Sequence, residues 1–114
     1  MPPTRLPETD LRRIERFCAE MWPERFHAEV RAETHVRGNT VTLCETRVPF
    51  AGLTEWTHDH FAQLRFRPGS ADWALYRADR NSRWHENREG NVFSGTAAEL
   101  LAEIDEDPTS IFKG

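Results

Sequence analysis

The sequence predicts an α+β fold: a curved five-stranded antiparallel meander sheet flanked by an N-terminal and a C-terminal helix, in the order α-β-β-β-β-β-α. Apolar residues recur every three or four positions near both ends of the chain, whereas they alternate with polar residues in the middle. Short connections separate the alternating segments, which favours hairpins over crossovers. At 114 residues the chain is expected to form one domain, residues 1–114, around one core.

Both helices carry recognisable start signals. The first is expected over residues 8–21, with Thr9 as its N-terminal cap and Trp22-Pro23 ending it. The stretch Thr96-Ala97-Ala98-Glu99 has the pattern of a capping box, in which the Thr accepts from a backbone amide and the Glu reaches back. It predicts the start of the second helix. Ile111 and Phe112, in the tail, are expected to pack on the core.

Five strands are expected between the helices. The segment 27–36 alternates strictly, and Gly38-Asn39 predicts a tight hairpin turn into the second strand. This turn places Val36 opposite Val41 and Ala32 opposite Glu45. The expected ranges of the five strands are 27–36, 40–48, 61–67, 73–78 and 83–88.

Two charged residues interrupt the apolar face of the second strand. In the predicted register Glu45 and Arg47 occupy positions where a period of two asks for hydrophobic side chains. Three explanations remain open: the strand continues past the edge of the core, a bulge reverses its face, or the two charges are paired and partly buried.

The last two strands carry a second unusual pattern. A four-residue turn, 79–82, is expected between them, with Asp79 accepting hydrogen bonds from backbone amides. This turn places Arg77 opposite Trp84, where guanidinium and indole can stack. It also places Tyr76 opposite His85, beside small residues that suit the floor of a shallow pocket.

The segment His58-Asp59-His60 raises the question of a metal site, because imidazole and carboxylate ligands suit zinc. A metal site needs three or four ligands, and the sequence offers no partner pair at a spacing such as HExxH. We therefore expect no metal and no cofactor. The segment is expected to be a solvated lead-in to the third strand.

Composition narrows the class of protein. The net charge of −4 and the pI of about 5.7 argue against a dedicated nucleic-acid binder. The apolar runs are too short to span a membrane, and the N-terminus lacks the apolar middle of a signal peptide, so a cytoplasmic location is expected. Cys18 and Cys44 fit a reducing compartment and are expected to be buried.

The leading functional hypothesis is a small binding or interaction domain without catalytic activity, whose partner is a protein, including a second copy of the chain. It rests on the absence from the sequence of a complete nucleophile–base set, a phosphate-cradling glycine loop or a metal frame. The residues expected to form a binding site are Glu45, Arg47, Tyr76, Arg77, Trp84 and His85.

Two alternatives remain open. Strands three to five interleave arginines with Phe61, Phe66, Trp73, Tyr76 and Trp84, which are the ingredients of a single-stranded nucleic-acid platform. A small enzyme is the other alternative, with His85 as general acid/base and with Glu45, Arg47 and Arg77 around an anionic substrate. It requires these four side chains to converge.

A series of short motifs runs along most of the chain. In order they are Glu45-x-Arg47 with Pro49, Trp56, Ala62-x-Leu64-Arg65-Phe66, Trp73-x-Leu75-Tyr76-x-Ala78-Asp79, Trp84-His85, Glu106-Asp107-Pro108 and an ending from Phe112 to Gly114. This pattern resembles the family of small bacterial proteins called domain of unknown function 3024. Gln63 stands where a Lys is common in that family, and the tail lacks a frequent Cys. The resemblance implies a bacterial origin, a shared fold and a set of shared positions, and it implies no activity.

Overall fold

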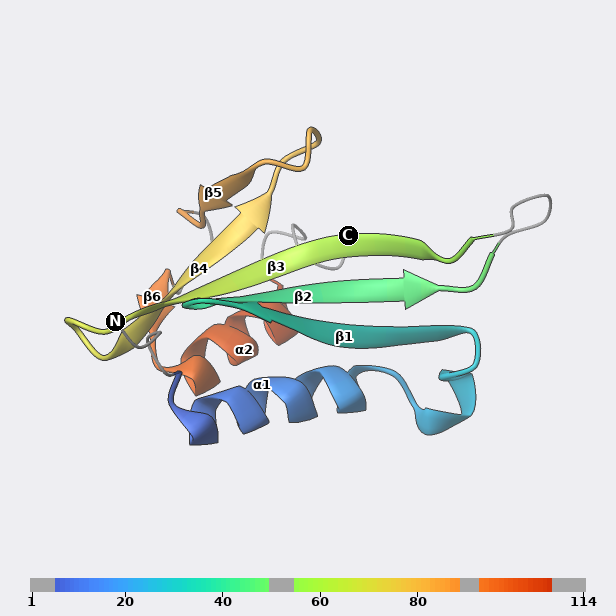
Figure 1. Cartoon of the computed structure of the whole chain (residues 1–114), viewed down its shortest axis with the longest axis horizontal. Helices are drawn as coiled ribbons and strands as arrows, with labels where there is room; N and C mark the ends of the chain where they lie inside the picture. Colours follow the sequence, from blue (N-terminus) through green and yellow to red (C-terminus); the bar gives the residue numbers. More distant parts are fainter. Residues whose placement is uncertain (1–5, 50–54, 89–92, 108–114) are drawn as a thin grey trace.

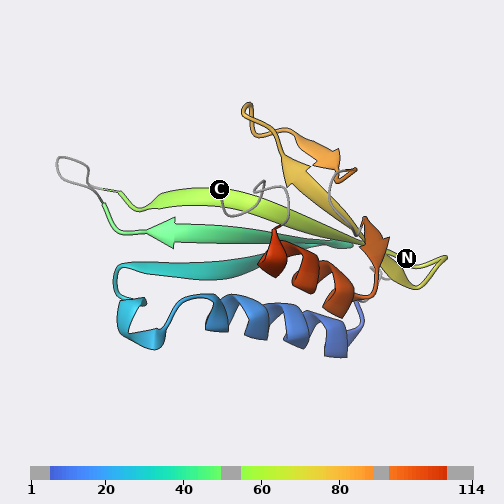
Figure 2. The ribbon, with the colours of Figure 1, turned by 180° about the vertical axis from the view of Figure 1, so that it is seen from behind.

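Two helices pack on one face of a twisted antiparallel sheet in the computed structural model, which describes residues 6–49, 55–88 and 93–107 (Figures 1 and 2). The strands follow one another in the order β1-β2-β3-β4-β5, and a short β6 pairs with β4. The elements are α1 (Glu8–Met21), a 3-10 turn η1 (Glu24–Phe26), β1 (Val30–Arg37), β2 (Thr40–Arg47), β3 (Thr57–Arg67), β4 (Asp72–Ala78), β5 (Trp84–Glu86), β6 (Ser94–Gly95) and α2 (Ala97–Glu106). The predicted α+β meander with two flanking helices is confirmed.

The core lies between the sheet and the two helices. The largest fully buried side chain is that of Trp73 in β4. Around it, α1 contributes Ile14 and α2 contributes Leu100 and Ile104, all completely shielded from solvent. Alternate residues of the central strands complete the cluster: Val41, Leu43, Ala62, Leu64 and Leu75. This inner face of the sheet is therefore the apolar one, and the opposite face is left to polar side chains.

The first helix starts earlier than its predicted cap. Pro7 occupies the N-cap position with φ −57° and ψ 121°, and no side chain caps the helix. Thr9 as the cap is therefore wrong, because Pro7 already has the extended backbone that precedes a helix and Thr9 lies within the first turn. Asp10 holds the helix instead: its Oδ2 accepts a hydrogen bond of 2.9 Å from Nε1 of Trp73.

The capping box of the second helix is confirmed. The Thr96 hydroxyl accepts from the Glu99 amide at 3.1 Å, and the Glu99 carboxylate accepts from the Thr96 amide at 3.0 Å. Gly95 precedes the box with φ +150°, and a Cβ added there would come within 2.9 Å of the Glu99 carboxylate. The glycine is therefore required by the cap. The predicted packing of Ile111 and Phe112 lies outside the described residues.

The first hairpin has the predicted register, with Val36 opposite Val41 and Ala32 opposite Glu45. The charged residues of β2 turn out to be paired with each other. Nε of Arg47 lies 3.2 Å from the Glu45 carboxylate, and the Arg47 guanidinium lies 5.5 Å from the centre of the Trp22 ring. The Glu45 side chain is 21% exposed. The explanation that the two charges are paired and partly buried therefore holds, at the end of the strand farthest from the turn.

The third strand begins at Thr57, four residues before its predicted start. Leu43 pairs with Ala62 and Cys44 pairs with His60, so Phe61 is an extra residue in β3, a β-bulge. The bulge explains the error. With uninterrupted alternation from Ala62, His58 and His60 would face the core. The extra residue turns them outward.

The last hairpin is one residue out of the predicted register. Asp79 Oδ1 accepts from the amides of Asn81 and Arg83 at 2.8 and 2.9 Å, and the Asp79 amide donates to the Arg83 carbonyl. The predicted role of Asp79 is correct, but Arg83 belongs to the connection, which therefore has five residues. Ala78 pairs with Trp84, so the predicted pairs of Arg77 with Trp84 and of Tyr76 with His85 are wrong.

Asp10 is the point at which α1 is fixed to β4, and its removal leaves a buried indole N–H without a partner. We expect Asp10→Ala to lower the free energy of unfolding by about 1–3 kcal/mol. Asp10→Asn keeps an acceptor oxygen and should lose less than half of that. Urea unfolding at constant m-value measures both. Glu15→Ala, at an exposed position of the same helix, is the control, and equal losses for all three variants would contradict the assignment.

Asp79 gives the last hairpin a dependence on pH. Hydrogen bonds from the Arg83 amide, from His85 and from the Asn81 amide lower the pKa of Asp79 from 3.8 to about 2. A pKa that is lower in the folded than in the unfolded state stabilises the fold above pH 3.8, and this contribution is lost as the pH falls towards about 2.

We therefore expect Asp79→Asn to be less stable than the wild type near neutral pH, and the difference to shrink as the pH falls from about 4 to about 2. Chemical unfolding at a series of pH values measures the difference. Glu20→Gln, on the exposed surface of α1, controls for the removal of one carboxylate. A difference between Asp79→Asn and wild type that stays constant or widens on acidification would show that the ionised carboxylate does not hold the turn.

Candidate ligand-binding site

The sheet has a polar face turned away from both helices, which we call the outer face. The register of the strands assigns its residues, because cross-strand partners share a face. Those of the three long strands β1 to β3 include Arg31, Glu33, His35, Arg37, Thr42, Cys44, Thr46, His58, His60, Gln63, Arg65 and Arg67, and those of β4 and β5 include Asp72, Tyr76, Ala78, Trp84 and Glu86. Guanidinium, imidazole, hydroxyl and carboxylate groups dominate this surface.

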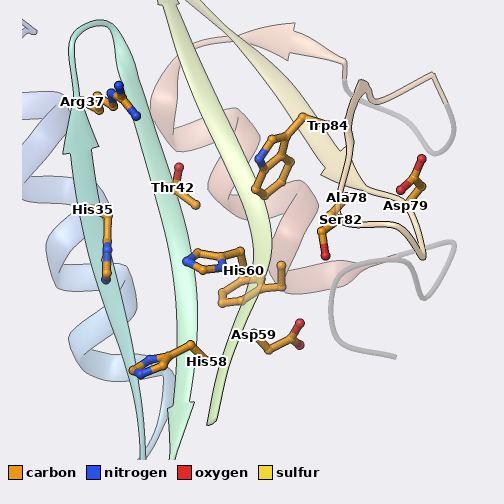
Figure 3. Close-up of a pocket in the computed structure, with 11 residues that line it drawn as sticks. His35, Arg37, Thr42, His58, Asp59, His60, Ala78, Asp79, Ser82 and Trp84 are labelled. Atoms are coloured by element: carbon orange, nitrogen blue, oxygen red, sulfur yellow. The ribbon is translucent and has the colours of Figure 1, made fainter. Parts of the chain in front are cut away.

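A pocket of about 460 Å³ opens on the outer face where β4 ends (Figure 3). β4 pairs with β3 only along residues 63–67 of β3, while β3 extends back to Thr57. The notch beside the first half of β3 is closed by the tip of the β4–β5 hairpin. Its walls are His35 and Arg37 of β1, Thr42 of β2, His58, Asp59, His60 and Phe61 of β3, and Ala78, Asp79, Ser82 and Trp84 of the hairpin.

Three imidazoles line one side of the pocket. The rings of His35 and His60 meet edge to face, with centroids 6.0 Å apart, although the residues are 25 positions apart in the sequence. Nδ1 of His58 lies 3.3 Å from the Thr46 hydroxyl. Within the described ranges, no group of three or more His, Cys, Asp or Glu side chains is arranged to hold a metal ion. The imidazoles are placed to exchange hydrogen bonds with whatever enters the pocket.

A chain of polar contacts crosses the outer face beside the pocket. Gln63, only 7% exposed, donates from Nε2 to the Thr42 hydroxyl at 3.0 Å and accepts from Nε of Arg65 at 2.7 Å. The Arg65 guanidinium in turn lies 3.8 Å from the centre of the Tyr76 ring. The chain joins β2, β3 and β4, so it fixes the side chains at the rim of the pocket.

Both carboxylate oxygens of Asp79, at the tip of the β4–β5 hairpin, have partners. One oxygen of Asp79 accepts the two amides of its turn, and the other lies 2.7 Å from Nε2 of His85. These contacts hold its pKa at about 2. A carboxylate with this pKa and these partners is a poor proton acceptor at neutral pH, so its part in the pocket is to shape the wall.

The six residues expected to form a site fall in three places. Trp84 lines the pocket and Tyr76 lies beside it on the outer face. Arg77 and His85 pair with each other and are turned to the other side of the hairpin, where Nε of Arg77 is buried without a hydrogen-bond partner among the described residues. Glu45 and Arg47 form their own ion pair on β2, on the inner side, with β3 between them and β4.

The residues that sequence reasoning missed are His35, Arg37, His58 and His60. The strict alternation of residues 27–36 already put His35 on the polar side of β1. The meeting of His35 with His60 depends on the pairing of β2 with β3 and on the bulge at Phe61, and neither is readable from local spacing. The one available signal was the alternation His58-x-His60, which is that of one face of a strand.

Comparison with known protein families identifies the family of the chain. The model of the family described as "Domain of unknown function (DUF3024)" matches residues 1–114, which is the whole chain. No curated protein and no solved structure matches the chain. Of the described helices, none is long and apolar enough to cross a membrane. The match extends over every motif noted in the sequence, and the chain belongs to the DUF3024 family.

Proposed function

We propose that the chain is a small, non-catalytic binding domain, and that the pocket on its outer face receives a ligand or a partner segment carrying an anionic group. The observation that carries the proposal is the gathering of Arg37, His35 and His60 at one side of a pocket of about 460 Å³. This volume lies in the range of pockets that hold small ligands.

The distribution of charge supports an anionic ligand. The charged positions on the outer face are Arg31, Arg37, Arg65 and Arg67 against Glu33, Asp72 and Glu86, a net charge of +1. Since the whole chain carries −4, the remaining residues carry −5. The outer face is thus less acidic than the rest of the chain taken together, and such a contrast orients an approaching anion, although the pocket itself is lined by Asp59 and Asp79 as well as by Arg37.

Of these four arginines, Arg37 is the one most available for a ligand. Arg65 donates to Gln63 and lies over the Tyr76 ring. Arg31 pairs with Glu33 at 3.4 Å and Arg67 pairs with Asp72 at 2.6 Å. Arg37, by contrast, is exposed and has no carboxylate partner in the described part of the chain, and it lines the pocket. A guanidinium can grip a carboxylate or phosphate with two parallel hydrogen bonds, which makes Arg37 the main anchor in the proposal.

The enzyme alternative has less support. Its four groups form two separate pairs, one on β2 and one on the hairpin beyond β3. A general base has to come within hydrogen-bond reach of its substrate, and the proposal therefore makes no use of Glu45, Arg47, Arg77 or His85 as catalytic groups.

A protein partner, including a second copy of the chain, is the second candidate. Its support is the exposure of four large apolar side chains in the described part of the chain: Phe26, Val36, Val48 and Phe93. All four lie outside the lining of the pocket. Light scattering at increasing protein concentration tests self-association directly, and a constant monomer mass removes a homodimer from consideration.

We also propose that the protein acts in the bacterial cytoplasm. Cys18 and Cys44 are both free and buried, and burial raises the pKa of the Cys18 thiol to about 12. Buried thiols of this kind are ordinary in a reducing compartment, where disulfides are rare. The bacterial origin that the family resemblance implies fits the same assignment.

Inorganic phosphate is the simplest probe of the anion site. In an amide NMR titration we expect saturable shifts at Arg37, His35 and His60 and none along α1. Arg37→Gln should weaken the phosphate affinity about tenfold, because a hydrogen bond to a charged group contributes about 1.5–3 kcal/mol. Arg12→Gln, which removes an exposed arginine paired with Glu8 on α1, is the matched control and should leave the affinity unchanged. Shifts spread evenly over the surface, or equal effects of the two variants, would sink the proposal.

A further inference from the structure

We infer that the ligand of this pocket is a nucleotide unit, in which a planar base stacks on Trp84 and the attached phosphate lies against Arg37 and the imidazoles of His35 and His60. The inference rests on the proposed function and names the chemical class of its ligand. It goes beyond an anion site because it assigns the aromatic wall of the same pocket a separate and testable part in binding.

Trp84 differs from the other three tryptophans of the chain. Trp73 is completely buried, and the rings of Trp22 and Trp56 each lie under a guanidinium, that of Arg47 at 5.5 Å and that of Arg31 at 5.0 Å. Among the described residues, the Trp84 ring has no aromatic or cationic partner, and it is only partly buried. It lines the pocket and projects over it from the hairpin (Figure 3).

The residues around Trp84 leave room for a stacked ring. Its cross-strand partner is Ala78, whose methyl group covers little of the indole face. The hairpin register is responsible, because a slip of one residue would have placed Arg77 opposite the indole and occupied it. An unoccupied indole face in a pocket is a platform for a planar group, and base–aromatic stacking contributes about 1–3 kcal/mol per base.

The aromatic and the basic walls of the pocket come from different strands. The basic side chains come from β1 and β3 and Trp84 comes from β5, yet all of them line the same pocket of about 460 Å³. Arg37 and His35 extend the basic wall from β1. A lone phosphate has a counterpart only on the basic wall and a single ring only on the aromatic wall, whereas a base joined through its sugar to a phosphate has a counterpart on both.

The remaining lining matches the edge of a base. The carboxylate of Asp59 and the hydroxyl of Ser82 lie near the hairpin side of the pocket (Figure 3). A carboxylate next to a cationic wall disfavours a ligand that is anionic throughout, but it accepts a hydrogen bond from an amino group on a base. A ligand with an anionic end and a donor-bearing planar end therefore fits the lining better than phosphate alone.

A folded protein fits the pocket less well. The four exposed large apolar side chains of the described chain lie elsewhere, and protein interfaces have apolar or aromatic centres from which charged residues are depleted. Here Asp59, Asp79 and Arg37 all line the pocket.

The experiment compares four probes on the full chain: inorganic phosphate, adenosine, adenosine 5′-monophosphate and a single-stranded hexanucleotide. We expect the monophosphate to bind at least tenfold more tightly than either phosphate or adenosine. Trp84→Ala should weaken the affinity for the monophosphate by about 5- to 100-fold, as expected for the loss of one stacking contact, and should change the affinity for phosphate less than twofold. Trp84→Phe keeps a ring and should recover part of the loss.

Trp56→Ala is the matched control, because it removes a tryptophan on the same side of the sheet that lies outside this pocket. It should leave all affinities within twofold. Amide spectra of α1 and α2 establish that each variant is folded. A monophosphate that binds no more tightly than phosphate, or that loses no more affinity with Trp84→Ala than with Trp56→Ala, overturns the inference while leaving the anion site intact. Absence of phosphate binding together with monophosphate binding unaffected by Arg37→Gln overturns the proposed function itself.

The hexanucleotide identifies the source of the nucleotide unit. Binding at least tenfold tighter than that of the monophosphate, and weakening steeply between about 50 and 200 mM salt, assigns the unit to a single-stranded polymer. Equal affinities assign it to a free nucleotide. Either result supports the inference if Trp84→Ala weakens the binding of both the monophosphate and the hexanucleotide.

Discussion

One extra residue in β3 decides what each side of the sheet carries. Phe61 is inserted between two residues that pair with neighbouring positions of β2, so that Ala62 and His60 belong to opposite faces although they are two apart in the chain. Without the bulge, one half of β3 would face the wrong side. Either the apolar residues after Phe61 would leave the core, or the histidines before Phe61 would enter the core. A buried imidazole without partners is costly, and the loss of buried aliphatic groups costs several kcal/mol as well. The bulge lets the apolar half of β3 face the core while the histidines of the other half face outward.

The pocket follows from that bulge and from the hairpin beyond it. Bulges increase the local twist of a strand, and here β4 separates from the first half of β3 at the same point. The tip of the β4–β5 hairpin is then free to bend over the exposed half of β3. Asp79 fixes the five-residue connection, and this connection sets the register that places Trp84 on the outer face. Two local backbone features thus bring together residues from five strands.

Local patterns predicted the elements well and their relations to one another less well. The periodicity of α1, the capping box of α2 and the register of the first hairpin all depend on residues close in sequence, and they were predicted correctly. The start of β3 and the register of the last hairpin were wrong, since each depends on a single inserted residue that reverses the alternation. Such insertions leave composition and spacing almost unchanged. The candidate site depends on both of them, which is why Trp84 was the one predicted site residue found in its lining.

The placement of His58 and His60 on the outer face, across β2 from β1, is therefore the basis of the pocket and of its proposed ligand. Nuclear Overhauser effects in the folded protein test this placement most directly. We predict contacts between the ring protons of His60 and those of His35, whose ring centroids lie 6.0 Å apart. Contacts from His60 to methyl groups of the core instead, such as those of Ile14 or Leu100, would contradict it, and the pocket and its proposed ligand would fall with it.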